Sequence, residues 1–231
     1  LIGGVKNGQF TNAETTFKGM KAEQEYGIID LANGKSQDDL IIKISEPDVP
    51  CEDFYFISTE LQTRTGIAVG NNASWNTLPR TVTNMSLNDK TYLNIVSGIL
   101  KSKGLTRAIA RIEQAVKIDL EGDGVDEVLI AANSYSENIS PSAKIGDYSF
   151  VLLRKIVKGK VQNIMISEEY IKKNIDFGAP SQFEISAIAD LNGDGKMEIV
   201  VYGEYYEGSG ATVYEMKGNK PTNVLETGCG V

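Results

Sequence analysis

The chain of 231 residues contains no histidine. This absence excludes Ser-His-Asp and Cys-His catalysis, because both mechanisms use an imidazole as general base. It also excludes zinc sites built on histidine. Any enzymatic activity of this chain would therefore have to work without the commonest proton-transfer group in proteins.

Cysteine is scarce, with only Cys51 and Cys229 in the sequence. Two cysteines can be inert buried thiols, but an even number in an exported chain also permits a disulfide. Such a bond would tie the first quarter of the chain to its C-terminal end. Both interpretations stay open at this point, because the sequence does not show whether the two Cα atoms approach each other.

Long apolar runs are absent, and none approaches the roughly 18 residues that a membrane-spanning helix needs. The run Val151-Leu-Leu, for example, is followed directly by Arg154 and Lys155. We therefore predict no transmembrane segment. We also expect that a signal or lipoprotein leader has been removed before Leu1, which would place the protein outside the cell or in the cell envelope.

Basic residues are outnumbered, with 23 Lys and Arg against 31 Asp and Glu, which gives a formal net charge of −8. Binding to nucleic acid or to an anionic membrane requires a basic surface. The sequence has no basic cluster that could supply one. We therefore exclude nucleic acid as a partner and expect an unknown protein or glycan partner instead.

Two acidic loops of the same pattern are the most informative part of the sequence. Loop 1 is Asp119-Leu-Glu-Gly-Asp-Gly-Val-Asp-Glu127, and loop 2 is Asp190-Leu-Asn-Gly-Asp-Gly-Lys-Met-Glu198. Both have oxygen-bearing side chains at positions 1, 3, 5 and 9 and glycines at positions 4 and 6. Calcium takes six to eight oxygen ligands, and glycine permits the tight turn that gathers them. The pattern predicts one calcium ion in each loop, with the backbone carbonyl of position 7 as a further ligand.

The residues after each loop exclude an EF-hand. An EF-hand has a bidentate Glu at position 12 and helices on both sides, whereas position 12 here is Ile130 or Val201. The flanking runs, such as Val128–Ala131 and Ile199–Tyr202, have the length and composition of strands. Each loop is therefore predicted to be the turn of a β-hairpin. The alternative is an ordinary Asp/Asn/Gly turn that binds no metal.

This strand-loop-strand pattern resembles the FG-GAP and VCBS-type repeats of integrin-α-like β-propellers, in which a calcium loop joins two strands of a blade. Both loops have Glu at position 9, where those repeats usually have Asp. The resemblance implies two ligand sets for structural calcium. They are Asp119, Glu121, Asp123, the Val125 carbonyl and Glu127 in loop 1, and Asp190, Asn192, Asp194, the Lys196 carbonyl and Glu198 in loop 2.

The whole chain is also similar to uncharacterised secreted or lipoprotein-type proteins of Gram-positive bacteria. Three segments carry this resemblance: residues 3–8, 147–154 and 200–206. It implies a location outside the cytoplasm and no particular activity.

Hydrophobic periodicity predicts a mainly β fold with one clear helix, in the α+β class. The helix is expected at Asn88–Lys103, capped by Ser86 or Asn88 and ended at Gly104, and a second short helix is possible at Glu168–Asn174. Two blade-like antiparallel units of four strands are expected at 108–119, 126–135, 147–158 and 161–167, and at 182–190, 197–206, 211–217 and 220–226. We expect either a small, irregular propeller-like fold or an α+β sheet with two calcium hairpins. Residues 1–85 are predicted to form a β-rich N-terminal region, and 86–231 the helix and both loop units, with one continuous domain as the alternative.

One cluster of tyrosines and acids is the first candidate for a ligand surface. It comprises Tyr202, Glu204, Tyr205 and Tyr206. Tyrosine faces beside carboxylates suit a sugar or a peptide, although strand alternation is expected to turn about half of these side chains into the core. Trp75 is a second aromatic candidate, either as a ligand platform or as a plug of the core.

Known enzyme motifs are missing. Neither Ser140 nor Ser142 stands three residues before Lys144, as an S-x-x-K motif requires, and no G-x-S-x-G elbow or phosphate-binding glycine loop occurs. The sequence therefore predicts a secreted or cell-envelope protein that binds structural calcium and recognises a protein or glycan. The alternative is a hydrolase, or an accessory domain of an enzyme that degrades cell walls or polysaccharides, because glycosidases need only two carboxylates.

Overall fold

The computed structural model describes residues 1–20, 25–31, 34–35, 40–41, 43–58, 66–70, 72–135 and 139–230. These residues form five antiparallel sheets and two helices. The prediction of a mainly β, antiparallel protein is confirmed, and none of the sheets closes on itself. No helix in the described ranges is both long and apolar enough to cross a membrane.

The first unit contains loop 1 and is a five-stranded sheet in the order β13-β12-β11-β10-β9. Its strands are β9 (Thr83–Asn84), β10 (Gln114–Ile118), β11 (Glu127–Asn133), β12 (Tyr148–Val157) and β13 (Lys160–Tyr170). The four expected strands are present, and the short β9 is added at the edge. The short helix suggested for Glu168–Asn174 is wrong, because its first residues extend β13 and pair with the start of β12, Tyr170 opposite Tyr148.

The second unit contains loop 2 and is a four-stranded sheet in chain order. Its strands are β14 (Gln182–Ala189), β15 (Glu198–Tyr205), β16 (Gly208–Lys217) and β17 (Lys220–Gly230). These are the four strands expected from the sequence, with β17 longer at its C-terminal end. In both units the loop joins two neighbouring strands as a hairpin, as predicted.

The expected helix is α2 (Lys90–Ser102). Its N-cap is Asp89, whose carboxylate accepts a hydrogen bond from the amide of Thr91 at 2.7 Å, so Ser86 and Asn88 are not the caps. Gly104 follows the helix with φ +91°, as a left-handed C-terminal residue should. Val96 and Leu100 are buried against the outer face of the first unit, beside Ile130.

The N-terminal region contains three small sheets and a second helix that the sequence analysis did not predict. Its elements are β1 (Gly3–Lys6), β2 (Gln9–Asn12), α1 (Ala13–Gly19), β3 (Glu25–Asp30), β4 (Gly34–Lys35), β5 (Leu40–Ile41), β6 (Lys43–Ser45), β7 (Phe56–Ser58) and β8 (Ile67–Gly70). The helix α1 is short and buries only Ala13, so it gives no apolar periodicity to read. Asn12 caps it by accepting from the amide of Thr15.

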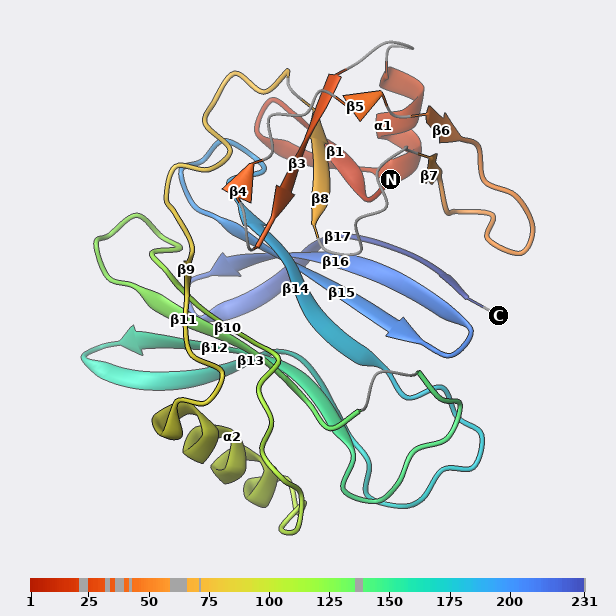
Figure 1. Cartoon of the computed structure of the whole chain (residues 1–231). Coiled ribbons are helices and arrows are strands. Elements are labelled where there is room, and N and C mark those ends of the chain that lie inside the picture. The colour runs from red at the N-terminus through yellow and green to blue at the C-terminus, as the bar shows by residue number, and fades with distance from the viewer. Residues whose placement is uncertain are drawn as a thin grey trace.

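The main elements lie in four layers (Figure 1): α2, the first unit, the second unit and the N-terminal sheet of β3 and β8. The space between the two units is filled by apolar side chains from both, such as Leu129, Leu153 and Ile199. The other face of the second unit, with Val200 and Val213, packs on Ile29 of β3. Because most of these strands are buried on both faces, their sequences are apolar runs rather than alternating patterns.

A disulfide joins Cys51 of the N-terminal region to Cys229 of β17, with the two Cα atoms 5.4 Å apart. It closes a loop across a sequence separation of 178 residues. The bonded alternative of the sequence analysis is therefore confirmed.

Candidate functional site

Loops 1 and 2 lie side by side and are held together by the segment that precedes the helix. The guanidinium of Arg80 donates to the carbonyls of Leu120 at 3.1 Å and Gly195 at 2.8 Å, and also to that of Asp119. The amide of Met197 donates directly to the Leu120 carbonyl at 2.9 Å. The two loops therefore form one continuous polar structure rather than two separate turns.

Trp75 belongs to the same structure and covers loop 2. Its indole N–H donates to the Asp190 carbonyl at 2.9 Å, and a Cβ added at Gly193 would come within 2.8 Å of the ring. The side chain thus closes the base of the loop. Trp75 is half-buried and packs on loop 2, so this contact decides neither for the ligand platform nor for the plug of the core.

The backbone of loop 2 folds around the carboxylate of its first residue. Asp190 accepts from the amide of Gly193 at 2.7 Å through one oxygen and from that of Gly195 at 2.9 Å through the other. Both glycines have φ near +80°, in the left-handed region where a side chain is disfavoured. The glycines at positions 4 and 6 are therefore required by this geometry.

The next two oxygen-bearing residues of loop 2 make Asx turns. The side-chain oxygen of Asn192 accepts from the amide of Asp194 at 2.9 Å, and Asp194 in turn accepts from the amide of Lys196 at 2.8 Å. These bonds fix the directions of the side chains at positions 3 and 5 before any ligand is present.

Glu198, at position 9, is the exceptional residue of loop 2. It is 1% exposed, and its Oε2 accepts from the amide of Leu191 at 2.7 Å. Its Oε1 is buried and has no hydrogen-bond partner in the part of the chain that the structure describes. Burial raises the pKa of Glu198 to about 8, against the lowering effect of the Leu191 amide, and the nearby carboxylates of Asp194 and Asp190 raise it further.

Loop 1 has the same internal bonds except at position 5, where the amide of Asp123 donates to Asp119 at 3.2 Å and not to the side chain of position 3. Asp119 accepts from the amides of Gly122 and Gly124, Asp123 accepts from that of Val125, and Glu127 accepts from that of Leu120 at 2.9 Å. Gly122 and Gly124 also have positive φ. The two loops are therefore copies of one backbone structure, as their common pattern predicts.

The two loops also differ in the residue of the neighbouring strand that lies beside the Glu at position 9. Val128 pairs with Arg154 in the first unit, so that Lys155 lies beside Glu127. Lys155 is buried, and its ammonium lies 2.7 Å from the Glu121 carboxylate. Burial is the main cause that raises the pKa of Glu127, and the charge of Lys155 opposes it.

The equivalent position in the second unit holds an acid. Ile199 pairs with Tyr214, so that Glu215 lies beside Glu198, where its charge contributes to the raised pKa of Glu198. The basic partner of Glu215 is Lys217, at 3.6 Å and largely exposed. Loop 1 thus has a buried positive charge among its acids, whereas loop 2 has an additional negative one.

Within the residues that the structure describes, no three acidic or cysteine side chains are gathered as a metal-binding group. The reason is visible in the bonds above, since the carboxylates of positions 1 and 5 are directed at backbone amides of their own loop. The donors that could hold an ion in loop 2 are the predicted ones: Asp190, Asn192, Asp194, the Lys196 carbonyl and Glu198. The unpartnered Oε1 of Glu198 is an oxygen for which a cation would be the missing partner, so the residues of loop 2 fit a hard cation.

The predicted tyrosine and acid cluster is divided between the faces of the second unit. Tyr202 lines a shallow apolar pocket with Ile2 and Phe54 of the N-terminal region. Tyr205 lines a larger groove on the opposite face. Tyr206 is 52% exposed beyond the end of β15 and contacts the ring of Phe177. The four predicted residues therefore do not form one surface.

Glu204, the acid of that cluster, lies close to Glu184 of the neighbouring strand. Burial is the main cause that raises the pKa of Glu184, and the negative charge of Glu204 raises it further. No motif in the sequence pointed to this pair, because it depends on the register of β14 and β15.

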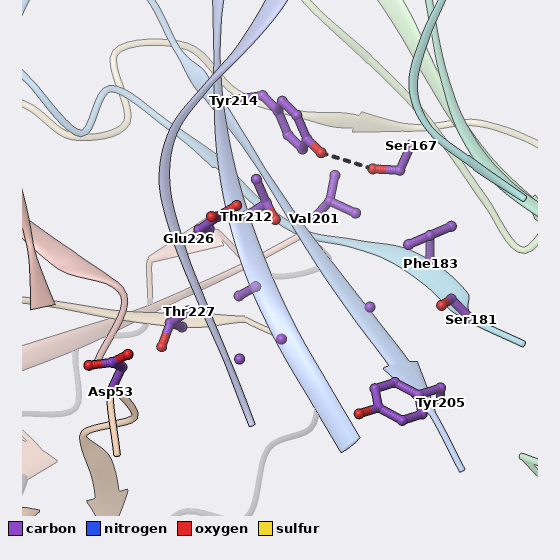
Figure 2. A pocket seen from close by; sticks show the side chains of 14 residues that line it. Asp53, Ser167, Ser181, Phe183, Val201, Tyr205, Thr212, Tyr214, Glu226 and Thr227 are labelled. Atoms are coloured by element: carbon purple, nitrogen blue, oxygen red, sulfur yellow. Dashed lines mark hydrogen bonds between the residues drawn. The ribbon is translucent and has the colours of Figure 1, made fainter. Parts of the chain in front are cut away.

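The groove that contains Tyr205 lies on the face of the second unit that is turned toward the first unit (Figure 2). Its volume is about 560 Å³, and Ser167 of β13 and Phe183 of β14 form part of its wall. The hydroxyls of Ser167 and Tyr214 lie 3.3 Å apart within hydrogen-bond distance. Sequence reasoning found only Tyr205 of these residues, since the others come together through strand pairing.

The fold and these sites define a mainly antiparallel β protein with two acidic hairpin loops and a disulfide between its terminal regions. Comparisons of the chain with family models, with curated proteins and with solved structures found no match. Its function must therefore be argued from the loops and the groove themselves.

Proposed function

We propose that this protein is a calcium-binding recognition protein, in which a structural Ca²⁺ ion bound by loop 2 fixes the second unit. The observation that supports this best is the buried Oε1 of Glu198, which has no hydrogen-bond partner among the described residues. A buried carboxylate oxygen without a donor or cation costs about 1–3 kcal/mol or more. A buried polar atom without a partner is expected where a bound ion or ligand supplies the missing interaction.

The donor set favours calcium over other metals. Loop 2 offers only oxygen atoms, since its candidates are Asp190, Asn192, Asp194, Glu198 and the carbonyl of Lys196. Oxygen donors favour hard cations, and a loop that can supply several of them suits the high and flexible coordination number of calcium. When bound, the ion supplies positive charge that offsets the repulsion among these acids.

In loop 1 the second predicted ion would compete with Lys155. The ammonium of Lys155 already neutralises Glu121 and lies beside Glu127. An ion could use these carboxylates fully only after the ammonium has been displaced. We therefore propose that loop 2 is the tighter calcium site and loop 1 the weaker one.

The proposed location is extracellular or in the cell envelope. The disulfide between Cys51 and Cys229 supports it, because disulfides persist in oxidising compartments. Calcium loops of modest affinity also suit the millimolar calcium outside cells. In this setting a rigid β protein with an open groove is suited to the recognition of a protein or glycan.

A propeller-like arrangement of FG-GAP or VCBS type is the architecture that we propose for the two loop units. Each unit is an antiparallel meander with a loop between neighbouring strands, and the units pack face to face. Leu129 of β11 packs against the second unit, and Val200 of β15 packs against the N-terminal sheet. Each loop unit thus packs one face on the sheet that precedes or follows it in the stack.

The test is thermal unfolding in EDTA and in increasing CaCl₂. Calcium at 100 times its dissociation constant should add about 2.7 kcal/mol to the free energy of unfolding and raise the melting temperature. The matched control is MgCl₂ at the same concentrations, which should have a much smaller effect because magnesium demands a more regular shell. Identical melting curves in EDTA and in millimolar calcium would overturn the proposal.

Recognition and hydrolysis are separated by a second measurement on the calcium-loaded protein. Oligosaccharides and peptidoglycan fragments are incubated with the protein, and both binding and product formation are followed. Binding without turnover supports a recognition protein, whereas turnover supports the alternative of a hydrolase.

A further inference from the structure

The groove of the second unit has a floor without side chains. Gly203 of β15 pairs with Gly210 of β16, which pairs with Gly228 of β17, so three glycines form one row across three strands. The row two residues to one side is Val201, Thr212 and Glu226, and the row two residues to the other side is Tyr205, Gly208 and Gly230. Side chains of these three rows share one face of the sheet.

Aromatic rings bound this glycine row. The Tyr205 ring lies over the neighbouring glycines, since a Cβ at Gly208 would come within 2.7 Å of its hydroxyl oxygen. The Phe183 ring lies against the end of the row, 3.2 Å from the position of a Cβ at Gly203. Strand spacing makes the glycine row about 10 Å long, and its flanking rows are about 13 Å apart. The result is a short trough that runs across the strands (Figure 2).

The polar groups of the groove are hydroxyls and carboxylates. Among the described lining residues, five with a hydroxyl group lie on this face or in its walls: Ser167, Ser181, Tyr205, Thr212 and Tyr214. Glu226 is the acid of this face, and none of the described lining residues is Lys or Arg, whereas Thr227 shares the opposite face with Ala211 and Tyr202. The groove can therefore exchange hydrogen bonds with a ligand rich in hydroxyls and repels anionic ligands.

The glycine row does not suit an extended peptide. A peptide adds to a sheet along a free strand edge, through backbone hydrogen bonds. Here the trough crosses the strands, and the strands of its floor are already paired with one another. A flat ligand that contacts the floor by van der Waals packing, and the walls by hydrogen bonds, fits this surface better.

We infer that this groove binds a neutral saccharide, with one sugar ring seated on Gly210 and Gly228, next to the Phe183 ring that covers Gly203. The carbon face of the ring packs on the glycine backbone and against Tyr205. The sugar hydroxyls donate to the carboxylate of Glu226, which shares this face of the sheet. This inference rests on the recognition role proposed above and gives it a ligand class, but it does not depend on calcium in either loop.

The experiment is calorimetric titration of the full chain in millimolar CaCl₂ with neutral hexasaccharides of glucose, mannose and N-acetylglucosamine. Polygalacturonate serves as the anionic probe and a lysine-rich peptide as the cationic one. At least one neutral hexasaccharide should bind, and polygalacturonate should not. Binding of the peptide alone, or of none of these probes, would overturn the inference.

Two substitutions locate the binding site. Gly228→Val fills the trough; its Cβ lies 3.3 Å from the backbone carbonyl oxygen of Ser209, a close contact, so thermal unfolding of the variant is used to verify that the sheet still folds. Tyr205→Leu removes the aromatic wall. Each should weaken saccharide binding about tenfold or more, as expected for the loss of one well-packed contact.

The matched control is Tyr202→Leu, which changes the same residue type on the opposite face of the same strand. It should leave saccharide affinity unchanged, and equal weakening by Tyr202→Leu and Tyr205→Leu would contradict the assignment. Calcium titration and thermal unfolding of each variant are measured on the same samples. A failure of calcium binding can thereby be distinguished from a failure of the groove.

Discussion

Loops 1 and 2 share acids at positions 1, 5 and 9 and glycines at positions 4 and 6, and in both loops backbone amides donate to the carboxylates of positions 1 and 9. They differ at position 3, which is Glu121 in loop 1 and Asn192 in loop 2, and in the strand that passes beside them, which brings Lys155 to loop 1 and Glu215 to loop 2. The comparison shows that a loop motif specifies a backbone structure, whereas its charge balance depends also on a residue far away in the sequence. Two copies of one motif can therefore differ in their need for an ion.

The physical basis of this difference is the cost of burying negative charge. Glu127 and Glu198 are both almost fully buried, and burial raises the pKa of both. The positive charge of Lys155 offsets that cost in loop 1, whereas the negative charge of Glu215, at the equivalent position beside loop 2, adds to it. Substitutions beside loop 1 and beside loop 2 should therefore have different effects.

The largest effect is expected from Lys155→Met. The substitution leaves Glu121 and Glu127 without their buried cation, and breaking a buried ion pair from one side costs about 3–5 kcal/mol. Partial exposure of Glu121 places the expected loss near the lower end, about 3 kcal/mol, in urea unfolding with EDTA present. Calcium should restore more stability to this variant than to the wild type. A variant as stable as the wild type in EDTA would show that Lys155 does not compensate loop 1.

The next effect comes from the pair Glu198→Gln and Glu127→Gln. In EDTA, Glu198→Gln replaces a buried carboxyl group whose raised pKa shows that its charged form is costly, and it should be neutral or stabilising, whereas Glu127→Gln removes a carboxylate that Lys155 compensates and should cost about 1–3 kcal/mol. In saturating calcium, Glu198→Gln should lose the stabilisation that the ion gives to the wild type. Urea unfolding under both conditions measures this, and equal behaviour of the two variants would contradict the comparison.

A smaller effect is expected from Arg80→Lys, which tests whether the loops act together. Lysine cannot reproduce the forked donation to Leu120 and Gly195, so a loss of about 1–2 kcal/mol is expected. Arg107→Lys, at an exposed position, is the control and should change little. If the two variants unfold alike, the two loops are not joined through Arg80.

The smallest effect is expected from Glu215→Gln. Loss of its charge beside Glu198 should weaken calcium binding at loop 2 about two- to threefold, or about 0.5 kcal/mol, because Glu215 also has the partly exposed partner Lys217. Glu207→Gln, an exposed acid outside both loops, should leave the affinity unchanged. Calorimetric calcium titration measures both variants, and unchanged affinity in Glu215→Gln would remove this acid from the site.

Local sequence patterns were sufficient for the loops, the eight strands around them and α2. Each depends on neighbouring residues, such as the glycines at 193 and 195 that must adopt positive φ. The short helix α1 was missed because it buries only one residue. The helix suggested after residue 168 was wrong because pairing with β12 satisfies the same backbone groups.

The features on which the proposals depend are set by strand register, which the sequence did not reveal. Lys155 reaches loop 1 only because Val128 pairs with Arg154, and the trough exists only because Gly203, Gly210 and Gly228 align. A shift by one residue in either sheet would turn these side chains to the opposite face. The tyrosine cluster was divided for the same reason.

A crystal structure determined with a few millimolar CaCl₂ tests the central claim most directly. An anomalous difference peak is expected in loop 2, with an ion about 2.3–2.6 Å from Oε1 of Glu198. The proposal also expects this peak to be stronger than any peak in loop 1. Solvent alone in loop 2, or an ion bound in loop 1 only, would contradict it.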